Sequence, residues 1–137
     1  MPTTKGKKIV FSPESEGFSK AQWDKGKAEM LDILTKVAAR QKTIFYSELS
    51  QSLGSIHIEP HGGAMASMLG QISEDEDGKG RGMLSVLVVH KTGEQTPGKG
   101  FYKCAVGLGK DVSDPDGFWI AELKRVHEYW SNSNLGH

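Results

Sequence analysis

Three side chains able to bind a metal ion lie within the short sequence HIEPH, namely His57, Glu59 and His61. Imidazole nitrogens and carboxylate oxygens are common zinc ligands. The spacing does not match the helical HExxH motif, and the HxE motif of nucleotide deaminases requires a later PCxxC that this chain lacks. The segment is therefore expected to be a polar connector that binds no cofactor. A small metal-dependent enzyme that uses these residues or His90 is an alternative interpretation.

Cys104 is the single cysteine of the chain. One cysteine excludes an internal disulfide, fits a reducing compartment and removes most structural zinc sites. We expect no catalytic residue in this sequence, so the protein is interpreted as non-enzymatic.

The charged residues are balanced in number but unevenly distributed. The 17 Lys and Arg residues equal the 17 Asp and Glu residues, which is unlike a tight nucleic-acid binder because phosphate neutralisation needs clustered cations. Acidic residues concentrate in Glu74–Asp77, whereas Lys79–Lys110 is basic. Within it, HKTGEQTPGKG carries Lys91 and Lys99 among three glycines and one proline, which allow close approach to a phosphate backbone. A solvated loop is the alternative.

The elements that must position these residues begin with a long helix. Apolar residues recur at helical spacing over Lys20–Arg40, and Ser19 is a suitable N-cap. A very short strand is expected at Thr43–Phe45 because these residues are β-branched or aromatic. Ser47 is then expected to cap a second helix, with Leu49 and Leu53 on its inner face and Gly54 at its end.

A third helix, a hairpin and a last helix complete the predicted elements. The third helix ends in the acidic run and has apolar residues at helical intervals, at Ala64, Met65, Met68, Leu69 and Ile72. The pattern of Met83–Gly107 predicts a β-hairpin whose first strand is apolar on both faces. The sequence SDPDGF opens the last helix, whose apolar stripe is Phe118, Trp119, Leu123, Val126 and Trp130.

This order of elements predicts an α+β fold class. The expected architecture is a winged helix-turn-helix core with a β-hairpin wing and an added C-terminal helix packed against the first helix. A length of 137 residues fits one domain. We expect a flexible N-terminal arm at 1–18, a single domain at 19–131 and a frayed tail at 132–137.

The run from Thr43 to Tyr102 resembles the winged-helix DNA-binding domain of the DNA alkyltransferases and alkyltransferase-like proteins. TIFYSELSQSLG is similar to the opening of that domain, SMLGQIS to its recognition helix, and LVVHKTGEQTPGKGFY to the segment with the reactive cysteine. This chain has Val89 at the position of that cysteine, and Ser67 stands where the family has an arginine that replaces a flipped base. The resemblance implies a winged helix and nucleic-acid contact without alkyl transfer. LSVLVV and the turn after it are also similar to small bacterial proteins, so a bacterial origin is expected.

The predicted function is weak, salt-sensitive binding of duplex DNA. The third helix would enter the major groove, with Ser67 and Gln71 toward the base edges. Phosphate would be contacted by four cations, Lys79, Arg81, Lys91 and Lys99. The leading alternative is a winged helix that contacts protein, which the neutral net charge and the acidic run favour.

No membrane segment is predicted. No apolar run approaches the roughly 20 residues of a membrane helix, and the basic N-terminus is not followed by the apolar segment of a secretory signal. We therefore expect a cytoplasmic location and no membrane partner. The aromatic C-terminal helix, with Trp130 near its end, is the expected contact surface for a protein partner or a second copy of the chain.

Overall fold

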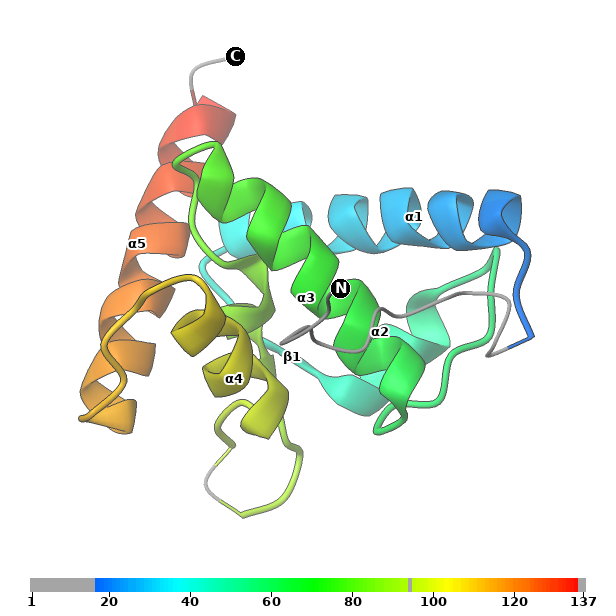
Figure 1. Ribbon diagram of the computed structural model, residues 1–137. Coiled ribbons are helices and arrows are strands. Elements are labelled where there is room, and N and C mark those ends of the chain that lie inside the picture. Colours follow the sequence, from blue (N-terminus) through cyan, green and yellow to red (C-terminus); the bar gives the residue numbers. More distant parts are fainter. Residues whose placement is uncertain (1–16, 94, 136–137) are drawn as a thin grey trace, which may run out of the picture.

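The computed structural model describes residues 17–93 and 95–135, and in these ranges it contains five α-helices and two short strands (Figure 1). The α+β class is therefore borne out in its coarse form, as a mostly helical protein with a two-stranded sheet. Most of the expected N-terminal arm lies outside the described residues. None of the helices in the described ranges is both long enough and apolar enough to cross a membrane.

The first predicted helix is confirmed as α1, Lys20–Ala39. Ser19 is its N-cap, because the Ser19 hydroxyl accepts a hydrogen bond from the Gln22 N–H at 3.1 Å. The buried face of α1 contacts α3 and α5, which lie across and beside it in Figure 1. Its buried residues are Trp23, Gly26, Met30, Leu34, Val37 and Ala38.

The connector that follows α2 is held against α1 by one carboxylate and one close backbone contact. The Glu29 carboxylate accepts hydrogen bonds from the N–H groups of Gly54 and Ser55 at 2.8 and 3.0 Å. The hydrogen bond from the Ser55 hydroxyl, together with these two, lowers the pKa of Glu29. Further along, Ile56 packs on Gly26, where a Cβ atom would lie only 2.5 Å from the Ile56 Cγ2. The absence of a side chain at Gly26 lets the connector approach the helix.

The predicted short strand is present as β1, Ile44–Phe45, but its partner is parallel. It pairs with β2, Val88–Val89, in the register Ile44 to Val88 and Phe45 to Val89. Both residues of β2 are buried, as expected for a strand that is apolar on both faces. The sheet thus joins the start of α2 to the segment after α3.

The second helix, α2, spans Tyr46–Ser52 and begins two residues earlier than predicted. Ser47 lies inside it and is not the N-cap. The cap position is Phe45, whose backbone N–H donates to the Glu48 carboxylate at 3.1 Å. A carboxylate in the first turn satisfies this free N–H, and it also interacts favourably with the helix dipole. The early start places Tyr46 directly after β1.

The third helix, α3, spans Gly63–Gly78 and includes the whole acidic run. Two residues of this run, Glu76 and Asp77, are not solvent-exposed. The Glu76 side chain is buried and forms two hydrogen bonds with Arg81, at 2.7 and 2.8 Å. Asp77 forms ion pairs with Lys110 at 2.9 Å and Arg125 at 3.2 Å. These contacts stabilise the last turns of α3, which continue past its final apolar residue, Ile72.

The predicted β-hairpin is wrong. After α3 the chain forms a 3₁₀ turn, η2, at Leu84–Leu87, then β2, and then a loop that leads into a helix, α4, at Lys99–Gly107. Phe101 and Ala105 are the buried residues of α4. Their spacing of four residues places both on one face of a helix, whereas a strand of alternating exposure would separate its buried residues by two. The wing of a winged helix is therefore not confirmed.

The last helix, α5, spans Pro115–Leu135, so part of the expected frayed tail is helical. It packs on α1 as predicted, and its residue Val126 is fully buried. The rest of its apolar stripe is partly buried against the core, at Phe118, Trp119, Leu123 and Trp130. The Trp119 indole N–H donates to the Val86 carbonyl at 3.1 Å, which ties α5 to η2.

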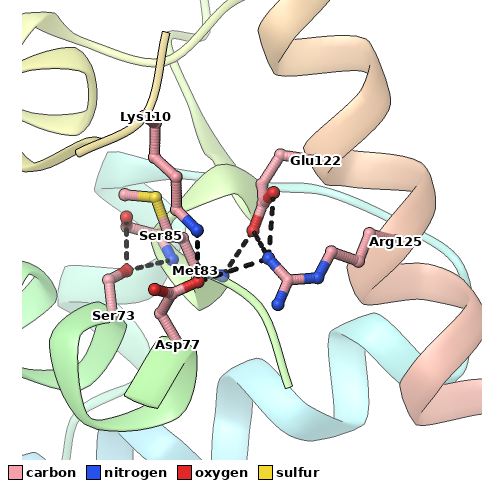
Figure 2. Close-up of polar contacts among 7 residues, drawn as sticks. All are labelled: Ser73, Asp77, Met83, Ser85, Lys110, Glu122 and Arg125. Carbon is pink, nitrogen blue, oxygen red and sulfur yellow. Dashed lines mark hydrogen bonds and ion pairs between the residues drawn. The ribbon is translucent and has the colours of Figure 1, made fainter. Parts of the chain in front are cut away.

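A buried polar network holds the segment before η2 between α3 and α5 (Figure 2). The Glu122 carboxylate accepts hydrogen bonds from the Met83 N–H at 2.8 Å and from the Arg125 guanidinium at 3.1 Å. On the other side, the Ser73 hydroxyl accepts from the Ser85 N–H at 3.0 Å and donates to the Ser85 hydroxyl at 2.6 Å. Since both serines are buried, these hydrogen bonds fix the path of the backbone through η2 toward β2.

Candidate binding pocket

A cavity of about 390 Å³ lies among α2, α3, α4 and the segments next to them. Its walls are mainly apolar, with Met65, Leu69 and Phe101 as the large contributors. No Asp or Glu is found among the described residues that line it, which are Tyr46, Pro60, His61, Gly62, Met65, Ala66, Leu69, Gly70, Ser85, His90, Gly98, Lys99, Gly100, Phe101 and Cys104. Apolar clefts of this size with a few polar groups are the usual form of small-molecule sites.

Three flat side chains, which we call the ring group, lie together in the pocket wall. They are Tyr46, His61 and His90. The Tyr46 ring centroid lies 5.3 Å from that of His61 and 5.1 Å from that of His90. The two imidazole rings are 5.7 Å apart and stacked at 27°. The ring group therefore offers a ligand both flat surfaces for stacking and imidazole nitrogens for hydrogen bonding.

The Tyr46 hydroxyl is fixed by the chain that enters α4. It accepts a hydrogen bond from the Gly98 N–H at 2.9 Å. Burial raises the pKa of Tyr46, and the hydrogen bond from Gly98 only partly offsets this, so the phenol is protonated at neutral pH. No described residue accepts the Tyr46 hydroxyl proton, so this proton is free for a ligand.

Gly98 is needed for that hydrogen bond because it leaves room for the ring group. A Cβ atom at this position would lie 3.1 Å from the Tyr46 hydroxyl oxygen and 3.4 Å from the His90 Nε2. A side chain would therefore push directly on two members of the ring group.

A second hydroxyl is available deeper in the wall. Ser85 is only 4 % exposed, and its oxygen accepts the hydrogen bond from Ser73. A serine hydroxyl can donate one hydrogen bond in addition to those it accepts, and no described residue accepts the Ser85 proton. Ser85 and Tyr46 thus place two hydroxyl donors in a mainly apolar cavity wall.

The first turn of α4, which begins next to the ring group at Gly98, provides positive charge. Gly98, Lys99 and Gly100 all line the cavity. The N–H groups of Lys99 and Gly100 lie in the first turn, where a helix provides no acceptor of its own and its dipole favours a negative charge. Lys99 adds a full positive charge. With no acidic side chain among the described lining residues, this end of the cavity favours an anion.

The pocket brings together part of the predicted nucleic-acid surface. Lys99 lines the cavity, and Lys91 is exposed at the other end of the same loop, next to His90. The loop is closed by a hydrogen bond from the His90 N–H to the Thr96 carbonyl at 3.0 Å. Ser67 is partly exposed on α3 beside Ala66, which lines the cavity.

The other predicted contacts lie elsewhere and have structural partners. Gln71 accepts a hydrogen bond from the Trp23 indole at 3.0 Å, which joins α3 to α1. Arg81 is held by Glu76 through both carboxylate oxygens and lies over the Trp130 ring at 5.6 Å. Lys79 is exposed, but it lies 3.9 Å from the same Glu76 carboxylate. These three positions are at the far side or end of α3, away from the cavity.

The three side chains of HIEPH do not converge on one point. Over residues 17–93 and 95–135, no three His, Cys, Asp or Glu side chains are arranged to hold a metal ion. His57 and Glu59 contact each other at 2.9 Å on the exposed surface. His61 points instead to Tyr46 and His90. The segment is a connector, but its second histidine belongs to the pocket.

Sequence reasoning missed the pocket because its members are far apart in the chain. Tyr46 and Gly98 are 52 positions apart, and only the pairing of β1 with β2 brings their segments together. Cys104 also lines the cavity, although it was predicted to lie in a strand. The available signal was the group of small residues around Lys99, in PGKGF, which is a suitable start for a helix at a binding site.

No protein-family model, curated protein or solved structure gives a significant match to this chain.

Proposed function

We propose that the protein is a non-enzymatic nucleic-acid-binding protein that binds a single-stranded segment over the pocket. Bases would stack on the ring group, and phosphates would contact Lys91 and Lys99. The observation that carries this proposal is that flat side chains and the exposed Lys99 line the same cavity, while the exposed Lys91 follows His90 in the chain. Aromatic surfaces beside cations are the usual means by which proteins bind unpaired strands.

The features of α3 favour a single strand over the major groove of a duplex. A recognition helix needs exposed side chains that reach base edges, but Gln71 is occupied by Trp23. Ser67 alone would distinguish few base pairs. The second half of α3 carries Glu74 and Asp75, which are exposed and would repel phosphate. Unpaired bases can stack on the ring group without any contact with the major groove of a duplex.

We propose that the core of the protein resembles a winged helix. The order α1, β1, α2, α3 is the order that such a core requires. The usual place of the wing is taken by the loop after β2 and by α4. In this proposal the loop performs the task of a wing, which is to bring Lys91 and Lys99 to the phosphate backbone.

Fluorescence polarisation with labelled DNA tests the proposal. A single strand and its duplex are titrated at low and moderate salt. We expect tighter binding of the single strand and weaker binding as salt increases. Lys91→Ala combined with Lys99→Ala should reduce the slope of log affinity against log salt by about 1.4, because each phosphate contact on a single strand contributes about 0.7.

The matched control is Lys25→Ala combined with Lys124→Ala, which removes the same charge from exposed positions on α1 and α5. This variant should bind like the unmodified protein. An equal loss in both double variants would mean that net charge, and not the pocket, determines binding. The absence of binding to either DNA at low salt would exclude the proposed function.

Contact with protein is a second candidate function, favoured by two exposed apolar side chains on α5. Ile120 is 59 % exposed and Tyr129 is 38 % exposed. Nine residues on a helix place these two side chains on opposite faces of α5, and we propose that Ile120, the more exposed of the two, lies in a contact between two copies of the chain. Light scattering over a concentration series should show a mass that rises toward a dimer, and Ile120→Glu should keep the protein monomeric. A constant monomer mass would exclude this candidate.

A further inference from the structure

We propose that the cavity is a binding site for one nucleoside 5′-monophosphate, either as a free nucleotide or as the phosphorylated end of a strand. The base would lie against the ring group, and the phosphate would lie at the first turn of α4. This inference uses the same site as the proposed function and deepens it by naming the ligand. Four observations support it, namely the size, the charge, the rings and the free hydroxyl donors of the cavity.

The size favours one small molecule. A volume of about 390 Å³ is near the lower end of the roughly 300–1,000 Å³ that is typical of ligand pockets. The cavity is bounded below by the buried side chains Met65, Leu69 and Phe101. A cavity with a closed floor can take up one nucleotide unit, either the end of a bound strand or a free ligand.

The charge of the lining favours a terminal phosphate over an internal one. A phosphate monoester carries about −1.5 to −2 charges at pH 7, whereas an internal diester carries one. Lys99 and the first turn of α4 face the cavity, and the described lining has no carboxylate to oppose them. The imidazoles of His61 and His90 can add donors to the same anion.

The rings and hydroxyls favour a base as the other half of the ligand. Tyr46, His61 and His90 present flat surfaces within 6 Å of one another. The free hydroxyl protons of Tyr46 and Ser85 can donate to ring nitrogens or carbonyl oxygens of a base. Since an unpaired donor in an apolar wall costs free energy, a ligand that accepts these protons gains affinity over a plain hydrocarbon ring.

Isothermal titration calorimetry tests the inference with AMP and UMP, and with adenosine and uridine as the probes that lack phosphate. We expect each monophosphate to bind at least about tenfold more tightly than its nucleoside, because charge-assisted hydrogen bonds contribute about 1.5–3 kcal/mol. Equal binding of nucleotide and nucleoside, or no binding of either monophosphate, would overturn the inference.

Two variants locate the binding within the protein. Ala66 lies on α3, is exposed and lines the cavity, and a Cβ added at Gly100 would touch its Cβ at 3.8 Å. Ala66→Phe should therefore fill the space and abolish AMP binding, whereas Ala21→Phe, at an exposed position on α1, should not. Lys99→Ala should weaken AMP at least about tenfold and leave adenosine unchanged. AMP binding that survives both Ala66→Phe and Lys99→Ala would place the nucleotide elsewhere.

Oligonucleotides separate this inference from the proposed function. A single strand with a 5′-phosphate should bind more tightly than the same strand with a 5′-hydroxyl, and AMP should compete with it. If both strands bind equally and AMP does not bind, the proposed function stands and the nucleotide site is wrong. If AMP binds and neither strand does, the nucleotide site stands and strand binding is wrong.

Discussion

Glu122 on α5 accepts a hydrogen bond from the backbone N–H of Met83, which lies 39 positions earlier, at 2.8 Å. Glu122 is only 6 % exposed and also contacts Arg125 (Figure 2). The segment from Met83 leads through η2 into β2 and then to the ring group. This one carboxylate therefore links the packing of the last helix to the backbone that forms one wall of the pocket.

Glu122→Ala is expected to destabilise the protein by about 1–3 kcal/mol, because it leaves the buried Met83 N–H without an acceptor and leaves Asp77 as the remaining carboxylate partner of Arg125. Urea unfolding followed by tryptophan fluorescence measures this change. Glu128→Ala is the matched control, at an exposed position on the same helix, and should change stability by less than about 0.5 kcal/mol. Equal effects of the two substitutions would contradict a structural role for Glu122.

Gly26→Ala is expected to destabilise the fold by about 1–3 kcal/mol through overpacking. The new methyl group would meet Ile56 at 2.5 Å. In the Ile56→Ala background the cost of Gly26→Ala should fall, since the clashing atom is absent. Gly70→Ala is the control, because no atom lies within 4 Å of its added Cβ. It should stabilise α3 by about 0.5–1 kcal/mol. Thermal unfolding of the four variants tests this prediction.

The sequence predicts the helix that contains Gly26 but not the contact that requires a glycine there. The helical spacing of apolar residues predicted α1, α3 and α5, because each must bury one face. A glycine inside α1 indicated only a loss of helix propensity. The actual reason for it, the approach of Ile56, depends on a connector whose position is set by tertiary contacts. Local patterns show which face of an element is buried, but not which segment covers it.

The hairpin was mispredicted for a related reason. The apolar residues of β2 and the turn residues after it match a hairpin as well as they match a strand, a loop and a helix. The segment of α4 contains Phe101, Tyr102 and Val106, which are common in strands. Tertiary contacts with α3 decide in favour of a helix. The pocket could not be predicted once α4 had been assigned as a strand.

Asp77→Asn is expected to reduce the dependence of stability on acid pH. Burial alone would raise the pKa of Asp77, but the hydrogen bonds and charges of Lys110 and Arg125 outweigh burial, and the pKa lies below its usual value of 3.8. A carboxyl group whose pKa is lower in the folded state stabilises the fold above the unfolded pKa. That stabilisation is lost as the pH falls through the folded pKa.

The free energy of unfolding should therefore fall from about pH 5 downward, and less steeply in Asp77→Asn than in the unmodified protein. Urea unfolding at a series of pH values gives the two slopes. Asp32→Asn is the control, since its ion pair with Lys36 is exposed on both sides and such pairs contribute little. A slope that is unchanged in Asp77→Asn would show that Asp77 does not contribute to the pH dependence.

Gly98→Ala is expected to disturb the ring group and to destabilise the protein by about 1 kcal/mol, because the added methyl group crowds the Tyr46 hydroxyl at 3.1 Å. In the Tyr46→Phe background the hydroxyl is absent, so the cost of Gly98→Ala should be smaller. A double-mutant cycle by thermal unfolding measures the coupling. Additive effects of the two substitutions would contradict direct contact between the two residues.

The loop between His90 and Thr96 has a consequence for how this protein could change during evolution. Its two ends, His90 and Thr96, are joined by a backbone hydrogen bond, so the residues from 91 to 95 lie between them, whereas Tyr46, His61 and Gly98 lie outside the loop. Side chains within the loop can therefore be exchanged with little effect on the cavity walls. Selection could alter the charge and shape at the mouth of the site, and so its preferred ligands, while the scaffold beneath stays the same.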